Sequence, residues 1–358
     1  DPKRPDHTYC SRGGYLSPVQ FDPTEFGIPP SILEATDTTQ LLALHVAKMA
    51  LADAGYDDSR EFDRERAGVI LGITGTQELV ISLGARLGHP LWRKSLAEAG
   101  VDPKTTEEVI RRISDGYVSW QENSFPGLLG NVVAGRIANR LNLRGTNCVI
   151  DAACASSLGA VHLAMLELAT GRADMILSGG ADTLNDIFMY MCFSKTPALS
   201  PTGDARPFSA NADGTVLGEG IGMVVLKRLA DAERDGDRVY AVIRGMGTSS
   251  DGRSQSIYAP HAAGQARCLR NAYELAGISP QSVSLLEAHG TGTTVGDATE
   301  FDALRTVFRE AQGDGAWCAL GSVKSQIGHT KAAAGAAGMV KAALAIYHAS
   351  LPPTLKIS

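Results

Sequence analysis

The amino-acid sequence predicts an α/β fold built from a duplicated module of helices and strands. Short apolar runs alternate with longer helical runs, which is typical of parallel sheets covered by helices on both faces. Glycine occurs 39 times in 358 residues and gathers beside the apolar runs, as tight joints between strands and helices require. The same order of elements then recurs further along the chain, which indicates an internal duplication.

The first half, residues 1–235, begins with a predicted helix over residues 38–54 that ends at Gly55. A buried strand of sequence Gly-Val-Ile-Leu-Gly follows over residues 68–72 and runs into a Thr-Gly-Thr loop at 74–76. Residues 77–120 are polar and helical in parts, and we expect an insertion or lid there. Further helices are predicted over residues 131–141 and 155–170, and strands over residues 147–151, 175–180 and 216–229.

The second half, residues 236–358, repeats this order after a predicted strand at 238–245. A helix over residues 262–276 ends at Gly277, and a strand over residues 283–288 again runs into a Gly/Thr loop. The strand at 319–323 and the Ala-rich helix at 331–350 match the strand and helix at 147–170. We therefore expect two related halves.

Bulk composition argues against several classes of protein. A net charge of −6 without a clustered basic face argues against nucleic-acid binding. The six cysteines include no Cys-x-x-Cys pair, so no structural zinc site is expected, and they suit a reducing cytoplasm. The apolar stretch at 332–351 contains Lys341 and is interpreted as a buried helix, so no membrane span is expected. We also find no signal peptide, and the missing initiator Met suggests a piece of a longer protein.

Cys154 is the first candidate catalytic residue. It follows the β-branched strand at 147–151 and comes directly before a predicted helix, as a nucleophile elbow requires. The positive end of the helix dipole is expected to lower the pKa of the thiol, and the nearby backbone N–H groups would stabilise an oxyanion. From its position alone, a buried structural cysteine is about as plausible.

Two histidines end strands in the second half. His289 enters the loop Gly-Thr-Gly-Thr, where the glycines allow close approach of a ligand and Thr291 and Thr293 offer hydroxyls. This loop matches neither a P-loop nor Gly-x-Gly-x-x-Gly, so nucleotide binding is not expected. His329 lies in the loop after the strand at 319–323. Ligands bind at the carboxyl ends of strands in such folds, so Cys154 and the two histidines form a candidate nucleophile with two proton-transferring groups.

Lys324 is difficult to explain as a core residue, because a buried ammonium is costly unless it is paired. Glu300, in the segment Gly296-Asp-Ala-Thr-Glu300, is its possible counter-charge. The alternative for Lys324 is a solvated loop residue.

Taken together, three segments of the chain resemble, in order and spacing, the signature segments of β-ketoacyl synthases. Further segments at 122–126, 190–198 and 254–260 are similar to the ketosynthase domains of polyunsaturated fatty acid synthases, a type of megasynthase related to polyketide synthases. The resemblance implies a thiolase fold, with two duplicated halves in a five-layer αβαβα core. The three signature segments are Asp151-Ala-Ala-Cys154-Ala-Ser-Ser, Glu287-Ala-His289-Gly-Thr-Gly-Thr and Gly321-Ser-Val-Lys324-Ser-Gln-Ile-Gly-His329.

The resemblance also implies roles. Cys154 would accept an acyl chain from a phosphopantetheine thioester, and His289 and His329 would bind the malonyl thioester, promote loss of CO₂ and stabilise the enolate. Lys324 would orient His329 or a carboxylate such as Glu300, while Thr291 and Thr293 would line the pantetheine channel. The domain would bind no cofactor or metal of its own, would work with an acyl carrier protein, and would form a homodimer.

Two alternative functions remain beside this resemblance, and the chain departs from the family pattern in two places. A thiolase acting on coenzyme A esters needs a second cysteine in a Cys-x-Gly context, which Cys318 does not provide. A non-catalytic chain-length partner would lack the nucleophile, whereas Cys154 is present. Members of the family begin with an earlier strand and end with a Gly-Phe-Gly-Gly-Thr-Asn-like loop. We therefore expect this chain to be a truncated catalytic unit.

Overall fold

The computed structural model describes residues 4–57, 59–75, 77–253, 256–311 and 316–357, so Thr76, Ser254 and Gln255 of the segments above lie outside the described residues. The larger sheet has the order β3-β2-β4-β6, with β2, β3 and β4 parallel and β6 antiparallel to β4. The strands are β1 Gly13–Gly14, β2 Ala67–Gly72, β3 Asn147–Ile150, β4 Met175–Asp182, β5 Leu217–Gly218, β6 Gly220–Leu226, β7 Leu285–Glu287 and β8 Ala319–Gly321.

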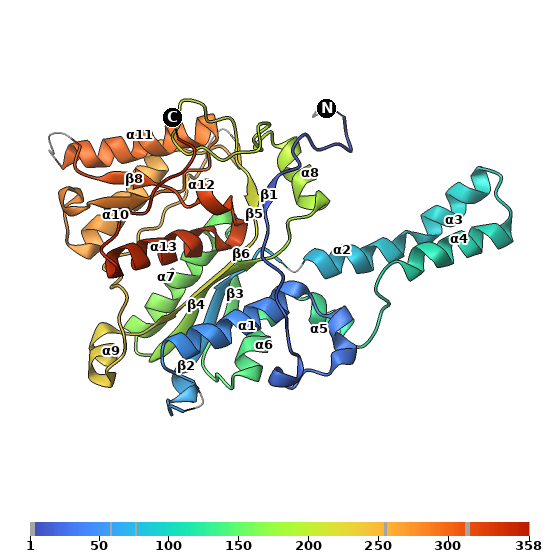
Figure 1. Cartoon of the computed structure of the whole chain (residues 1–358), viewed down its shortest axis with the longest axis horizontal. Helices are drawn as coiled ribbons and strands as arrows, with labels where there is room; N and C mark the ends of the chain where they lie inside the picture. Colours follow the sequence, from blue (N-terminus) through green and yellow to red (C-terminus); the bar gives the residue numbers. More distant parts are fainter. Residues whose placement is uncertain (1–3, 58, 76, 254–255, 312–315, 358) are drawn as a thin grey trace.

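Helices cover both faces of this sheet (Figure 1). The central strand β2 is buried along its whole length, and its side chains alternate between the faces. Val69 and Leu71 pack toward α1 and α6, while Ile70 packs toward α7. The helices are α1 Thr38–Asp53, α2 Gln77–Ala85, α3 His89–Glu98, α4 Pro103–Asp115, α5 Ser124–Leu128, α6 Val132–Arg140, α7 Ser156–Ala169, α8 Ile187–Lys195, α9 Leu229–Asp235, α10 Ala262–Ala276, α11 Thr294–Glu310, α12 Lys324–Ile327 and α13 Ala334–Tyr347.

The second half holds a smaller parallel sheet of β7 and β8. Helix α13 contacts α7 and also both β6 and β7, so α7 and α13 lie together between the two sheets. Helices α10 and α11 pack against each other through Ala266, Ala303 and Val307. This order of helices and sheets agrees with the α/β fold predicted from the sequence.

One predicted strand is wrong. Residues 238–245 are described, yet they form no β-ladder. A strand requires a partner, and this segment instead passes beside α10, where a Cβ on Gly245 would lie 2.5 Å from the Ala272 carbonyl oxygen. The apolar pattern of residues 238–245 predicts an extended segment. Whether another strand lies beside it depends on tertiary structure, which the local sequence does not show.

Residues 77–120 include helices α2, α3 and α4, which form an arm that extends away from the body of the molecule (Figure 1). Helices α3 and α4 pack against each other, and an ion pair of 2.7 Å joins Arg93 to Glu107 across them. Leu87 and Leu91 are exposed on this arm, and Trp120 is exposed just after it. These three apolar side chains are therefore exposed to solvent away from the hydrophobic core.

Among the described residues, no helix is both long enough and apolar enough to cross a lipid bilayer.

Gly72 lies where β2 meets the start of α7. A Cβ at this position would stand 2.3 Å from the Ser157 nitrogen and 2.4 Å from the Ser156 carbonyl carbon. Gly72→Ala is therefore expected to lower the free energy of unfolding by about 3 kcal/mol, because backbone rather than a flexible side chain has to move. Denaturant titration measures this loss. The matched control is Gly84→Ala in α2, where no described atom lies within 4 Å, and a comparable loss in both variants would contradict the prediction.

Candidate active site

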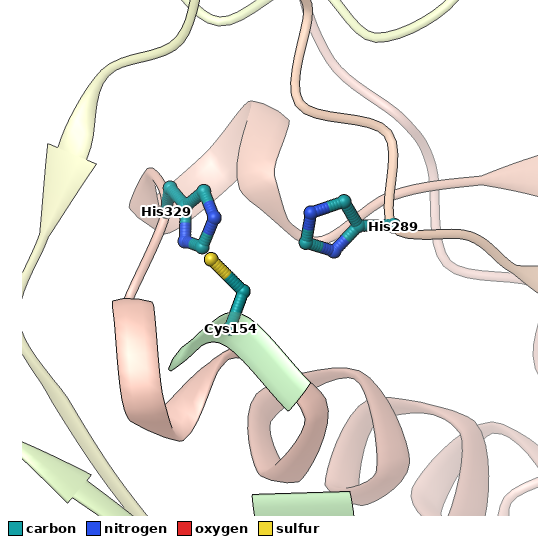
Figure 2. Close-up of side chains that lie close together, drawn as sticks. All are labelled: Cys154, His289 and His329. Carbon is teal, nitrogen blue, oxygen red and sulfur yellow. The ribbon is translucent and has the colours of Figure 1, made fainter. Parts of the chain in front are cut away.

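Cys154, His289 and His329 meet where the two halves of the molecule face each other. Cys154 lies in the 3-10 turn Ala153–Ala155 that follows β3, His289 follows β7, and His329 follows α12. The Cys154 sulfur and one ring nitrogen from each histidine all lie within 4.8 Å of one another. Figure 2 shows the thiol directed toward the His329 ring, with the His289 ring on the opposite side. The structure thus brings together the three residues that the sequence singled out from separate segments.

The turn that carries Cys154 is a strained elbow. Ala153 has a φ of 50°, in the left-handed region that residues other than glycine rarely adopt. Ser156 holds this turn, because its hydroxyl accepts a hydrogen bond from the Ala152 N–H (2.9 Å) and donates one to the Ala153 carbonyl (2.6 Å). The order of strand, turn and helix is the one expected for a nucleophile elbow.

Small residues hold α7 against α13 just behind the elbow. The Ser157 hydroxyl accepts a hydrogen bond of 2.9 Å from the Ala336 N–H, and Ser157 is fully buried. A Cβ on Gly335 would stand 2.4 Å from Leu158 Cγ, so a larger residue would push the helices apart. This contact fixes the distance between the Cys154 turn in one half and the His329 loop in the other.

His289 is held through its backbone by Glu300 and through its ring by Lys324. The N–H groups of His289 and Gly290 donate to the two Glu300 carboxylate oxygens at 2.7 and 2.8 Å. The Lys324 Nζ donates to the His289 carbonyl at 2.6 Å and lies 3.4 Å from its Nδ1. An ammonium offers donors alone, so Nδ1 accepts and Nε2 carries the proton. Lys324 is 3% exposed, which excludes the solvated alternative. Of its two expected partners, Glu300 acts through its charge, since it opposes the lowering of the Lys324 pKa by burial, while the hydrogen-bonding partner is His289 rather than His329.

His329 is deeply buried, and its ring orientation is set by the main chain. Its Nδ1 accepts a hydrogen bond of 3.0 Å from the Lys331 N–H, which places the proton on Nε2. Its own N–H donates to the Val216 carbonyl at 2.7 Å, and its carbonyl accepts from the Gly218 N–H at 2.9 Å. Both imidazoles therefore carry the ring proton on Nε2.

Burial controls the electrostatics of the site. Desolvation, with the Lys324 ammonium as the next cause, lowers the pKa of the buried His329 and also that of His289, although His289 as a residue is exposed to solvent. Both imidazoles are therefore neutral near pH 7. Desolvation also raises the pKa of the Cys154 thiol, and Lys324 offsets part of that rise. The predicted lowering of the Cys154 pKa by the start of the helix is therefore wrong, because loss of hydration outweighs it.

The Gly/Thr loop after His289 is held by a carboxylate that the sequence analysis missed. Asp297 accepts hydrogen bonds from the Gly292 N–H (3.1 Å) and the Phe208 N–H (2.7 Å), which ties the loop to the first half. Thr291 and Thr293 bond to each other through their hydroxyls at 2.8 Å and are partly buried. The acidic residue at the start of α11 was a usable signal, since buried carboxylates often cap backbone N–H groups.

The raised thiol pKa predicts how Cys154 reacts with iodoacetamide. Its alkylation rate is expected to keep rising through the pH at which an ordinary thiol has ionised, because the thiolate is the reactive form. Lys324→Met is expected to slow alkylation about three- to tenfold near pH 8, since a nearby positive charge is lost. Intact mass against time, from about pH 6 to 10, measures both rates. The exposed Cys192 is the internal reference, and a rate for Cys154 that levels off below about pH 7 would count against this assignment.

Two family models together match nearly the whole chain. The model for the N-terminal domain of β-ketoacyl synthases matches residues 1–232, and the model for their C-terminal domain matches residues 240–358. One polypeptide of the polyunsaturated fatty acid synthase of a Thraustochytrium species is 45% identical over 98% of this chain. One polypeptide of the phenolphthiocerol/phthiocerol polyketide synthase of Mycobacterium tuberculosis is 40% identical over 99% of it. The chain spans 13% and 18% of the lengths of these two relatives.

Solved ketosynthase structures show the same fold. The ketosynthase from module 6 of the bacillaene synthase of Bacillus subtilis superposes with a TM-score of 0.77 at 38% identity. That match covers 94% of this chain and 52% of the solved one. An oxazolomycin ketosynthase domain from Streptomyces albus matches with a TM-score of 0.81 at 31% identity, over 100% of this chain and 56% of the solved one. The thiolase-like architecture implied by the three sequence segments is confirmed.

Proposed function

Because this chain belongs to the β-ketoacyl synthase family, we propose that it extends acyl chains by decarboxylative condensation on Cys154. The observation that carries the proposal is the meeting of one thiol with two neutral imidazoles, within 4.8 Å of one another, between the halves of the fold. A thiol accepts an acyl group, and two imidazole N–H donors suit the enolate that follows loss of CO₂.

The reaction would proceed in two stages. The Cys154 sulfur attacks the carbonyl of an acyl thioester, a C–S bond forms, and the donor thiol leaves with the proton. A malonyl thioester then binds with its carbonyl oxygen near the Nε2–H groups of His289 and His329. Its carboxylate leaves as CO₂, and the resulting enolate carbon attacks the acyl carbonyl. Formation of the new C–C bond breaks the C–S bond to Cys154, and the released thiolate takes a proton from water, which regenerates the thiol.

The other residues of the site would have supporting roles. Lys324 would orient His289 and supply positive charge near the reacting oxygen, and Glu300 would hold the His289 backbone while partly balancing that charge. Thr291 and Thr293 would line the pantetheine channel. Neither imidazole would act as a base at Nδ1, since both Nδ1 atoms face donors.

The partner would be an acyl carrier protein that presents acyl and malonyl groups on phosphopantetheine, and the domain itself would hold no cofactor. The relatives are named as a polyunsaturated fatty acid synthase and a polyketide synthase, which supports a substrate that is a growing acyl chain. We also infer a cytoplasmic homodimer. The edge strand β3 has a neighbour on one side within the described sheet, which leaves its other side for pairing with a second copy, and the cysteines are free thiols.

The competing functions are a thiolase and a non-catalytic chain-length partner. A thiolase would place a second cysteine at the site, whereas the cluster in the described part of the chain pairs Cys154 with two histidines. The presence of Cys154 beside those histidines favours a catalytic role over a non-catalytic one. The family match also favours the synthase.

The test is a two-stage mass experiment on this chain. Incubation with an acyl carrier thioester is expected to add one acyl group to the protein, and a malonyl carrier thioester is then expected to remove it as a β-ketoacyl product. Free coenzyme A esters serve as the comparison donors. A folded protein that never gains the acyl mass would argue for the non-catalytic alternative, and equal turnover of both donor types would argue against the carrier partner.

A further inference from the structure

Asp182 and Lys331 form an ion pair beneath the site, at a distance of 3.0 Å. Asp182 ends β4 in the first half, and Lys331 begins the 3-10 turn Lys331–Ala333 in the second, so the pair joins the halves. The side chains are 10% and 6% exposed. A buried ion pair contributes little stability on average, and the proposed reaction uses neither charge. We therefore expect the pair to hold neighbouring groups of the site in place.

Lys331 is connected to His329 through a closed ring of hydrogen bonds. Its N–H donates to the His329 Nδ1 at 3.0 Å, and its Nζ donates to the Gly218 carbonyl at 2.8 Å. The Gly218 N–H in turn donates to the His329 carbonyl at 2.9 Å. The side chain of Lys331 thus anchors the same strand that holds the backbone of His329.

The backbone of Lys331 needs such an anchor. Its φ is 48°, in the left-handed region, which is a strained conformation for a residue with a Cβ. This conformation directs the Lys331 N–H at the His329 ring. If the side-chain contacts to Asp182 and Gly218 were lost, we expect this residue to relax toward negative φ and its N–H to turn away from Nδ1.

We propose that Asp182 and Lys331 are positioning residues that hold the His329 ring with its Nε2–H toward Cys154. The proposal rests on the proposed function in so far as that N–H binds the enolate oxygen. The pair would therefore act on decarboxylation and condensation, and much less on the loading of Cys154.

Nitrogen-15 NMR of the histidine rings tests the geometry without any reaction. The native His329 ring is expected to show an unprotonated Nδ1 and a protonated Nε2, with the signal assigned by its absence in His329→Asn. In Lys331→Met the two nitrogens are expected to shift toward a mixture of tautomers. The double variant Asp182→Asn/Lys331→Met leaves no unpaired buried charge, so it tests the same loss if the single variant does not fold.

The two stages of the reaction provide the second measurement. Lys331→Met and the double variant are expected to lower malonyl decarboxylation about tenfold or more, while acyl loading stays within about threefold of the native rate. The control is Lys227→Met, which removes another buried ammonium that pairs with Asp235 at 2.6 Å, in a cluster at α9. This control is expected to alter stability but not the ratio of the two rates.

The charges of the pair also act on the Cys154 thiol, which is a separate effect from the orientation of the His329 ring. The charged groups around Cys154 are Lys324, Lys331 and Asp182, and the two imidazoles are neutral. Lys331 lowers the pKa of the thiol and Asp182 raises it. Alkylation of Cys154 is therefore expected to slow in Lys331→Met and to quicken in Asp182→Asn.

Two results would overturn the positioning role. One is an unchanged His329 ring spectrum in the folded double variant. The other is an equal fall of loading and decarboxylation, as a general disturbance would cause. If the native chain neither loads nor decarboxylates, the proposed function fails, but the ring spectra still decide whether the pair orients His329.

Discussion

Replacing Cys154 with alanine is expected to abolish acyl loading completely. The variant has no other nucleophile at the meeting point of the described site, because the remaining groups are two neutral imidazoles and a buried ammonium. The acyl mass that the native chain gains should therefore be absent at any donor concentration. Decarboxylation of a malonyl thioester should persist in part, since both Nε2–H groups remain in place.

The matched control for this experiment is Cys192→Ala. Cys192 is an exposed thiol on α8 that does not belong to the site, so it would reveal any acylation outside the site. Loading should be unchanged in this variant. Acyl mass that persists in Cys154→Ala but disappears in Cys192→Ala would identify Cys192 as the acylated residue and would contradict the proposed mechanism.

Replacing His329 with alanine is expected to slow malonyl decarboxylation strongly and to leave acyl loading largely intact. Loss of one preorganised N–H donor to the enolate should lower malonyl decarboxylation about 10²- to 10³-fold. Acyl loading should change much less, because it depends on the thiol and on the elbow at the start of α7. Conversion of malonyl to acetyl thioester, followed by mass, measures the first rate, and the acylated protein measures the second.

His348→Ala is the control for this second prediction, because His348 is an exposed histidine at the end of α13. It should leave both rates unchanged. If His329→Ala abolished loading as strongly as decarboxylation, His329 would instead be needed to activate the thiol. That outcome would require a free base at Nε2, which conflicts with the hydrogen bond from the Lys331 N–H to Nδ1.

Local signals in the sequence were sufficient for much of the architecture. Gly55 and Gly277 end their helices with φ values of 79° and 65°, as a left-handed residue after a helix should. The buried strand β2 and the elbow at Cys154 were also predictable, because both depend on neighbours in the sequence. The roles proposed for the two histidines come from the family resemblance, since their positions alone do not specify them.

The features that the sequence did not predict depend on tertiary neighbours. The segment 238–245 has the composition of a strand but no ladder partner within the described residues. The pKa of Cys154 is raised because distant segments remove water from the thiol, an effect invisible in the local motif. Lys324 contacts His289 rather than His329, although His329 is nearer in sequence.

The close contact of α7 with α13 has a consequence for recombining synthases. Ser157 and Gly335 allow the two helices to touch, and through them the thiol of one half is set against the histidines of the other. A chimera that exchanges the segment after residue 236 would replace Asp237, which pairs with Arg60 of the first half at 2.8 Å, together with α13. It would also combine Cys154 from one parent with the two histidines from the other, across a contact of α7 with α13 that has little room for larger side chains. Productive crossovers should therefore carry both helices from the same parent.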